Sequence, residues 1–384
     1  MNNNIIFLGC TQNYGHQFSA ANTKVEFLAK GLTEIGDNCI IHNGLIGSRV
    51  VAQKESRQVE GVGEVLTYPK KGNQFISWIR NIPSLINDFK YCKKNGDNFV
   101  ILSVADYHIY LTYIILARIF KYKVIVISHE WATTISSVHW LRKPVMRLYA
   151  ATFGYFADAI LPISEYIIRR IAHFRKPYLK IPITAEYNDF HHCSVPEKSD
   201  YFLYCVFAAY KRVIMQIIDA YVEFVARSKS NVKLVLVLSG TQSQISPIVS
   251  YIGERVRQEK IIIKTKVPYA ELMSLYSNAL ALVVPLDPNC EQDEARFSQK
   301  IAEYLASGTP VISNNVGEIK YYFKDKDNII LCDYSVEGYV DAFDWVNNHF
   351  EEAEKIGERG FEVGKREFDY RKISKELHDF LKKV

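Results

Sequence analysis

The sequence has 384 residues, of which 48% are hydrophobic and 23% charged, and its formal net charge is +5 at pH 7. A chain of this length exceeds one ordinary hydrophobic core and suits two α/β domains of roughly 200 residues or fewer each. The charge excess is modest, so the composition does not indicate a nucleic-acid partner.

Cysteine usage and the N-terminus predict the compartment. The seven cysteines are scattered without metal-ligand or redox spacing, which favours a reduced, cytoplasmic protein. The chain begins with a predicted strand at 4–9 and shows no basic start, apolar run and cleavage site, so we expect no secretion signal. The most apolar window, 110–127, contains Arg118, Lys121 and Lys123, whereas a membrane span needs about 20 mostly apolar residues.

Short apolar runs alternate with helical stretches in the first half of the chain. Helices are predicted, for example, at 20–35 and 109–120. Strands that are apolar throughout and alternate with helices indicate a parallel sheet covered on both faces. The predicted strands of this first domain, residues 1–184, are 5–8, 39–42, 64–67, 99–103, 124–128 and 159–163.

A polar linker is predicted at 185–200, after which the same rhythm restarts in a second domain, 201–365. The remaining helix, 366–384, is expected to pack back on the first domain. We therefore predict an α/β fold with two doubly wound, Rossmann-like domains facing across a cleft, where the carboxyl ends of the strands bind ligands. The second domain's predicted strands are 201–207, 232–238, 261–263, 281–284, 310–313 and 329–331.

The stretch 296–313 is the most informative part of the sequence. Ser298 is predicted to cap a helix that runs through Ser307 and is ended by Gly308. A strand follows directly. This strand-loop-helix-Gly-Pro-strand context favours a ligand site over an ordinary amphipathic helix.

Charged side chains on this helix suit a nucleotide. Glu303 lies in the second turn, where a carboxylate can accept hydrogen bonds from ribose hydroxyls. The first-turn amides near Ser298 and the helix dipole favour a phosphate, and Arg296 and Lys300 add positive charge. The alternative is a helix whose Glu and Lys are merely solvated.

The run 297–312 resembles the donor-site signature of retaining GT-B-fold glycosyltransferases of the family 4 type. That family has two glutamates eight positions apart, and Glu303 matches the second, which binds the donor ribose. Ala295 stands at the first position, with Glu294 beside it. Other members with a Phe-Ser/Pro-x-Lys-x-x-Glu-Tyr pattern also lack the first glutamate.

The resemblance covers most of the chain, strongly in the second half, and includes 269–285, 157–165 and 180–183. It implies that Lys211, just after the first strand of the second domain, binds the donor diphosphate. The family's earlier arginine and glycine are absent, and Arg212 is a candidate substitute. The alternative is a solvated Lys-Arg pair, but cations at a helix N-terminus oppose the dipole and so favour an anionic ligand.

Three positions of the first domain are further candidates. Gly9 and Gly15 flank the loop after the first strand, which the family uses at the cleft; a simple turn is the alternative. His129 directly follows the strand 124–128, where the family often has a histidine near the transferred sugar. It is the catalytic candidate, with a structural histidine as the alternative. Asp106 is a weaker candidate.

We expect neither a metal nor another cofactor. Asp325-Lys-Asp327 matches an Asp-x-Asp metal motif but lies in a predicted turn, where Asp is common because it forms turns well. His191-His-Cys193 has no second ligand pair in the sequence. Lys211, Arg296 and Lys300 would instead stabilise the leaving diphosphate.

The resemblance implies transfer of a sugar from a nucleotide-diphosphate-sugar donor to a saccharide or lipid-linked glycan acceptor. It also implies retention of configuration, as in cell-surface polysaccharide synthesis. One alternative is a nucleotide-sugar 2-epimerase of the same fold, which would need cleft carboxylates for proton transfer. Another is a non-catalytic GT-B scaffold subunit, which Ala295 and the missing glycine before Lys211 would favour.

Residues 139–149 predict peripheral contact with an anionic membrane at its inner face. Apolar and basic side chains alternate there, as in interfacial helices. The alternative is a surface helix whose Trp140 and Leu141 pack inward. The residues concerned are Trp140, Leu141, Tyr149, Arg142, Lys143 and Arg147, with Lys70, Lys71, Lys93 and Lys94 elsewhere in the domain.

Overall fold

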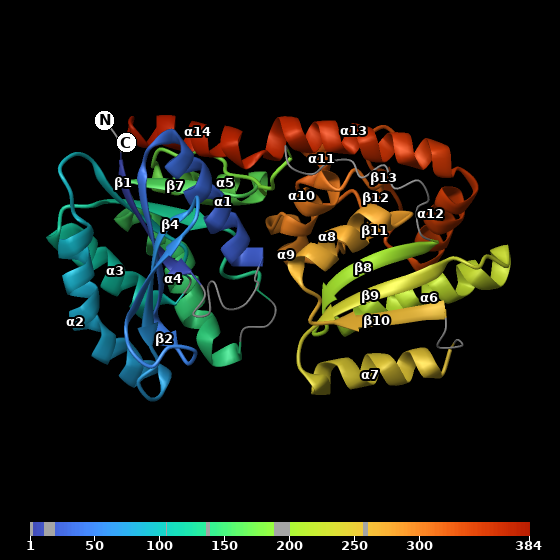
Figure 1. Cartoon of the computed structure of the whole chain (residues 1–384), viewed down its shortest axis with the longest axis horizontal. Helices are drawn as coiled ribbons and strands as arrows, with labels where there is room; N and C mark the ends of the chain where they lie inside the picture. Colours follow the sequence, from blue (N-terminus) through green and yellow to red (C-terminus); the bar gives the residue numbers. More distant parts are fainter. Residues whose placement is uncertain (1–2, 11–19, 105, 136–138, 188–199, 256–259) are drawn as a thin grey trace. The chain divides into compact units, whose positions relative to one another are not determined.

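The computed structural model describes residues 3–10, 20–104, 106–135, 139–187, 200–255 and 260–384. The chain forms two compact units (Figure 1). Unit 1 comprises Met1–Ala185, Glu294–Gln299 and Phe368–Val384, and unit 2 comprises Glu186–Asp293 and Lys300–Glu367. Residues 294–299, inside the range predicted for the second domain, are thus part of unit 1.

Within its described residues, unit 1 contains a seven-stranded sheet of order β3-β4-β2-β1-β5-β6-β7. Every pairing is parallel except that of β3 with β4. The chain builds outward from β1 in one direction and then in the other, which makes the carboxyl end of β1 a topological switch point. The strands are β1 (Asn4–Cys10), β2 (Asn38–Ser48), β3 (Glu55–Val59), β4 (Gly63–Pro69), β5 (Asn98–Leu102), β6 (Lys123–Ser128) and β7 (Ala159–Pro162).

The helices of unit 1 cover this sheet. Residues of β5 are buried without exception, because helices pack on both of its faces. The described helices up to the linker are α1 (Ala20–Ile35), α2 (Gln74–Cys92), α3 (Tyr107–Ile119), η1 (Trp140–Arg142), α4 (Lys143–Phe156), α5 (Glu165–Ile171) and η2 (Ala172–Phe174).

In the part of unit 2 that the structure describes, a six-stranded parallel sheet has the order β10-β9-β8-β11-β12-β13. Its switch point lies between β8 and β11. The strands are β8 (Tyr201–Phe207), β9 (Lys233–Ser239), β10 (Ile261–Thr265), β11 (Ala281–Val284), β12 (Val311–Ser313) and β13 (Ile330–Leu331). The helices are α6 (Lys211–Ser228), α7 (Gln242–Gly253), α8 (Tyr269–Asn278), α9 (Glu291–Ala295), α10 (Gln299–Ala306), α11 (Ile319–Tyr322), α12 (Val336–Asn348) and α13 (Phe350–Phe368).

The last helix, α14 (Tyr370–Leu381), is part of unit 1 and packs on α1. A Cβ added to Gly31 of α1 would lie 2.4 Å from Ser374 Oγ, so the two helices approach closely at this glycine. His378 Nδ1 lies 2.7 Å from Asp37 Oδ2, and the same carboxylate accepts a hydrogen bond from the Asn3 backbone N–H. The chain's last residues therefore complete the core of its first unit.

The predicted architecture of two parallel α/β sheets is confirmed, and α1 matches the predicted helix 20–35. Of the described strands, the antiparallel strand β3 was not predicted. The sequence of β3, Glu-Ser-Arg-Gln-Val, has no apolar run, because an edge strand with half-exposed residues needs none.

Candidate functional site

The helix α10 of unit 2 carries the residues that the sequence singled out for the nucleotide. It begins one residue after Ser298 and ends near Gly308, whose φ of 68° favours glycine. Side chains on all sides of this helix are buried, including Ile301, Ala302 and Leu305. A helix that is buried all round removes any charged side chain on it from water.

Glu303 is the charged side chain that this burial affects most. Its side chain is 4% exposed, and its Oε1 atom has no hydrogen-bond partner within the part of the chain that the structure describes. Burial raises the pKa of Glu303 to about 7, and the nearby charge of Lys300 opposes the increase. A buried acceptor without a donor is costly, so this carboxylate suits a ligand that brings hydroxyl donors.

The surroundings of Glu303 come from β8, α8 and α10 itself. The Tyr304 hydroxyl accepts a hydrogen bond from the Cys205 backbone N–H at 3.2 Å, and the Tyr276 and Tyr304 rings pack edge to face with centroids 4.7 Å apart. Burial raises the pKa of the Cys205 thiol, and the charge of Lys300 opposes this increase, as it does for Glu303. Lys300 and Glu303 therefore lie together near the carboxyl end of β8.

Lys211 and Arg212 begin α6, and the structure gives them different roles. Arg212 is exposed and forms an ion pair with Asp287, with Nη2 at 2.9 Å from Oδ2. Among the described residues Lys211 has no ion pair, and Tyr210 provides no side-chain cap for the first turn. Lys211 is thus the cation of this pair that is available to an anion at the helix N-terminus.

Gly9 of unit 1 is required by local packing. Its φ is +90°, and an added Cβ would lie 2.1 Å from Val104 Cγ2 and 2.7 Å from Ser103 O. Close packing of β1 against the segment after β5 therefore requires glycine whether or not a ligand binds. Gly15 lies outside the described residues. Asp106 forms an ion pair with Arg142.

His129 directly follows β6 in unit 1. Its ring is half-buried overall, but Nε2 lies on the buried side and has no hydrogen-bond partner within the described ranges. Burial, reinforced by the charge of Lys24, lowers the pKa of His129 to about 3. The imidazole is therefore neutral at physiological pH, where it can donate or accept a hydrogen bond but carries no charge.

Lys24 is a candidate that the sequence reasoning missed. It lies in α1, is 3% exposed and donates a hydrogen bond from Nζ to the Ile181 carbonyl at 2.7 Å. Burial lowers its pKa to about 7. The sequence did indicate that Lys24 is buried, because it lies four residues before Leu28 and eight before Leu32 and so shares their buried face of the helix.

Arg296 and Ser298 belong to the segment 294–299 of unit 1. Ser164 Oγ donates a hydrogen bond to the Ala295 carbonyl at 2.6 Å, and the Gln299 side-chain amide bonds to both the N–H and the C=O of Thr184. Ala295, where the resembled family has a glutamate, is completely buried. The start of the predicted donor motif is thus held by hydrogen bonds within unit 1.

The residues considered for metal binding have structural roles or lie outside the described residues. Asp325 Oδ1 accepts a hydrogen bond from the Leu331 backbone N–H at 2.8 Å, and Asp327 Oδ1 lies 3.6 Å from Arg359 Nε. His191 and Cys193 belong to the part of the chain that is not described. Among the residues that are described, no group of three or more His, Cys, Asp or Glu could hold a metal ion.

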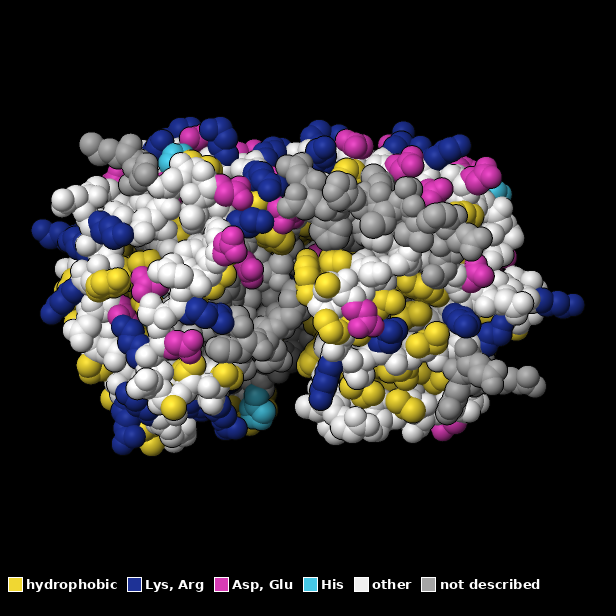
Figure 2. All heavy atoms as spheres, viewed as in Figure 1, with side chains coloured by type: hydrophobic (Ala, Val, Ile, Leu, Met, Phe, Trp, Pro, Cys, Tyr) yellow, Lys and Arg dark blue, Asp and Glu magenta, His cyan; other side chains and the backbone are white. Residues whose placement is uncertain are grey.

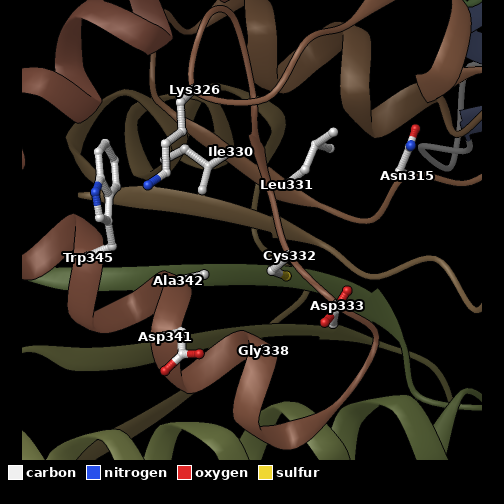
Figure 3. A pocket seen from close by; sticks show the side chains of 10 residues that line it. All are labelled: Asn315, Lys326, Ile330, Leu331, Cys332, Asp333, Gly338, Asp341, Ala342 and Trp345. Atoms are coloured by element: carbon white, nitrogen blue, oxygen red, sulfur yellow. The ribbon is translucent and has the colours of Figure 1, made fainter.

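A separate cavity of about 480 Å³ lies in unit 2 between α12 and the segment around β13 (Figure 3). The Lys326 side chain extends toward Trp345, and its ammonium lies 4.7 Å from the centroid of the indole ring. None of the predicted site residues lines this cavity. It is therefore distinct from the surroundings of Glu303.

Several solved structures share this fold along their whole length. Sucrose-phosphate synthase from Thermosynechococcus elongatus matches with a TM-score of 0.75 at 14% identity, covering 100% of this chain and 99% of that one. The trehalose-6-phosphate synthase OtsA matches with a TM-score of 0.75 at 10% identity, covering 99% of each chain. Anabaena HepE in complex with UDP matches with a TM-score of 0.71 at 12% identity, covering 100% of each chain. The fold is therefore that of the GT-B glycosyltransferases.

A family comparison matches the second half of the chain. Residues 190–363 match the family described as glycosyl transferases group 1. A search among curated proteins finds no match. Residues 190–363 are therefore similar to a glycosyl transferases group 1 domain, and the chain as a whole has the GT-B fold.

Burial of Glu303 predicts a specific pH dependence of stability. Because its pKa rises from 4.5 to about 7 on folding, the contribution of Glu303 to stability is complete below pH 4.5 and is lost as the pH rises through 7. As the pH rises from 4.5 to 8, the free energy of unfolding of Glu303→Gln should increase by roughly 3 kcal/mol relative to that of the wild type. Urea denaturation of the ligand-free proteins measures this difference.

The control is Glu358→Gln, at an exposed position of α13 in the same unit. It should follow the wild type at every pH. Parallel pH profiles for the wild type and Glu303→Gln would contradict the burial of an unpaired carboxylate.

Proposed function

We propose that this chain transfers a sugar from a nucleoside-diphosphate sugar to a saccharide or lipid-linked glycan acceptor, with retention of the anomeric configuration. The observation that carries the proposal is the buried Glu303 carboxylate without a hydrogen-bond donor, in a group 1 glycosyl transferase domain. Ribose hydroxyls supply two donors in the arrangement that such a carboxylate accepts. The HepE structures contain UDP or UDP-glucose, which favours uridine nucleotides as the first donors to test.

Each unit contributes a separate part of the proposed reaction. In unit 2, Glu303 holds the ribose while Lys211, Lys300 and the first-turn amides of α6 stabilise the diphosphate. In unit 1, the catalytic candidate His129 is neutral and provides a hydrogen bond to the saccharide that this unit binds. Arg296 and Ser298 precede α10 and remain candidates for the diphosphate.

The bond changes of the reaction can be written in full. The anomeric C–O bond to the diphosphate breaks, and the leaving oxygen keeps the electron pair. The acceptor hydroxyl oxygen forms the new bond on the same face, and its proton passes to the leaving phosphate. Cations that neutralise the diphosphate lower the barrier because negative charge increases there in the transition state.

Loss of the Glu303 carboxylate is expected to weaken nucleotide binding. Glu303→Ala removes hydrogen bonds to a charged acceptor, which are worth on the order of 1.5–3 kcal/mol, or about ten- to hundredfold in affinity. Calorimetry with UDP measures the affinity of this variant and of Glu358→Ala, which should bind as the wild type does. Unchanged affinity in a folded Glu303→Ala protein would remove this residue from the site.

The products formed by the wild-type protein distinguish the proposed activity from its alternatives. Incubation with UDP-sugars and oligosaccharide or lipid-linked acceptors should yield UDP and a new glycoside with the donor's anomeric configuration, as read by NMR. A 2-epimerase would instead change the sugar at C2, and a scaffold subunit would leave the donor intact.

Catalysis is expected to be independent of divalent metals, because Lys211, Lys300 and helix amides can neutralise the diphosphate. Donor turnover should be unchanged within about twofold by EDTA, since protein cations replace the metal's electrostatic role. Activity that is lost with EDTA and restored with manganese would contradict this expectation and make Asp325 and Asp327 candidate ligands.

An exposed face of unit 1 supports peripheral contact with an anionic membrane at its inner, cytoplasmic side. Trp140 and Leu141 of η1 are 68% and 61% exposed, so they do not pack inward. Lys143 and Arg147 of α4 are exposed beside them. Tyr149 does not belong to this face, because it is buried and its hydroxyl donates to the Val104 carbonyl.

Neighbouring helices extend the apolar surface, since α3 packs beside both α4 and α2. Figure 2 shows Lys and Arg side chains next to exposed hydrophobic ones on unit 1. Exposed large hydrophobic residues on these helices include Phe75, Ile76, Ile79, Ile115, Ile119, Val145 and Leu148. None of the described helices is both long and apolar enough to cross a bilayer.

Trp140→Glu is expected to reduce binding to anionic vesicles at least tenfold, because it removes an interfacial aromatic and adds a repelled charge. Co-sedimentation with phosphatidylglycerol vesicles at low and moderate salt measures the binding. Tyr321→Glu, at a 56% exposed aromatic of unit 2, is the control and should bind normally. If the wild type remains in the supernatant at low salt, the acceptor is not reached through this face.

A further inference from the structure

Lys24 is a buried cation without a matching acid. It lies in the second turn of α1, its side chain is 3% exposed, and no carboxylate among the described residues pairs with it. Removing an ammonium group from water is costly unless its charge is paired. The charge of Lys24 would therefore be stabilised by an anionic partner, which the described residues do not provide.

The hydrogen bonds of Lys24 are also incomplete. A lysine ammonium has three N–H donors. Within the described residues one is used, on the Ile181 carbonyl at 2.7 Å. Anchoring that carbonyl needs a single neutral donor, so it does not explain why a charged group occupies the position.

The position of Lys24 points to a ligand. The helix α1 follows β1 at the switch point of the unit 1 sheet, where open α/β folds bind their ligands. Ile181 joins the sheet at the end of β7, because its N–H donates to the Pro162 carbonyl. Lys24 thus lies inside the carboxyl edge of the sheet.

His129 supplies a second unsatisfied group at the same edge. It follows β6, and its buried Nε2 has no hydrogen-bond partner in the described ranges. The charge of Lys24 acts on this imidazole and helps to lower its pKa. Two buried nitrogens, both able to donate, therefore lie within electrostatic reach of each other, and no described acceptor joins them.

We propose that Lys24 and His129 form a subsite for an acidic group, a carboxylate or a phosphate, on the saccharide that unit 1 binds. Two oxygens of such a group can accept from the free ammonium N–H groups and from His129 Nε2–H. The negative charge also compensates the buried ammonium. The inference rests on the proposed glycosyl transfer and adds that its saccharide acceptor is acidic.

The test compares acidic and neutral sugars on the whole protein. Calorimetry with glucuronate, glucose 6-phosphate, inorganic phosphate and glucose should show the acidic sugars binding at least tenfold more tightly than glucose. Glucuronate and glucose 6-phosphate distinguish a carboxylate from a phosphate. Equal affinity for glucose and for both acidic sugars would overturn the proposal, and binding of inorganic phosphate alone would reduce the site to a free-anion site and overturn it as well.

Variants of α1 assign the preference to Lys24. Lys24→Met should abolish the preference for acidic sugars, and Lys24→Arg should retain part of it. The matched control is Lys30→Met, which removes a half-exposed lysine of α1 that stacks on the Tyr370 ring of α14. This variant should keep the preference for acidic sugars. An unchanged preference in Lys24→Met would overturn the assignment.

Two further readouts distinguish an acceptor-binding Lys24 from a donor-binding or purely structural one. UDP affinity should be the same in Lys24→Met as in the wild type; a matching loss of UDP affinity would assign Lys24 to the donor diphosphate instead and overturn the acceptor subsite. The melting temperature of ligand-free Lys24→Met at pH 7 should equal or exceed that of the wild type, whereas a purely structural lysine predicts a decrease. If the wild type fails to bind UDP at all, the proposed function fails rather than this inference.

Discussion

Burial of the Glu303 carboxylate is the constraint on which the donor site depends. The helix α10 is enclosed on all sides, so Glu303 is removed from water without a hydrogen-bond donor for Oε1 among the described residues. Lys300, one turn earlier, is the charge that offsets part of this cost. A protein that keeps such a group accepts lower stability in exchange for a preorganised acceptor of hydrogen bonds.

The two units place opposite charges at equivalent edges of their sheets. Unit 2 buries the carboxylate of Glu303 near the carboxyl end of β8, and unit 1 buries the ammonium of Lys24 against the Ile181 carbonyl, beyond the carboxyl end of β7. Among the described residues, each charge lacks a full set of partners within its own unit. A glycosyl donor with ribose hydroxyls and an acceptor with an acidic group would satisfy them separately.

Much of the fold was predictable from the sequence, because buried parallel strands are continuous apolar runs. Phe99 to Leu102 and Val124 to Ile127 are examples, and both became central strands. The strand β3 was not predictable in this way, because it lies at the sheet edge and carries Glu55 and Arg57. Periodicity detects burial on a face, and an edge strand with little burial gives no such pattern.

The candidate site was predictable only where a local pattern carried it. The Ser-x-x-x-x-Glu spacing of α10 identified Glu303, whereas the pairing of Arg212 with Asp287 joins residues that are 75 positions apart. The docking of residues 294–299 on Ser164 and Thr184 is equally non-local. Such contacts depend on the assembled fold and leave no trace in spacing or composition.

Proton release on nucleotide binding tests the central claim most directly. At pH 6 the free Glu303 is mostly protonated, and hydrogen bonds from both ribose hydroxyls favour its ionised form. Calorimetry of UDP binding in buffers of different ionisation enthalpy should therefore show the wild type releasing about one proton more than Glu303→Gln. Equal proton release by the two proteins would contradict a buried carboxylate that binds the nucleotide.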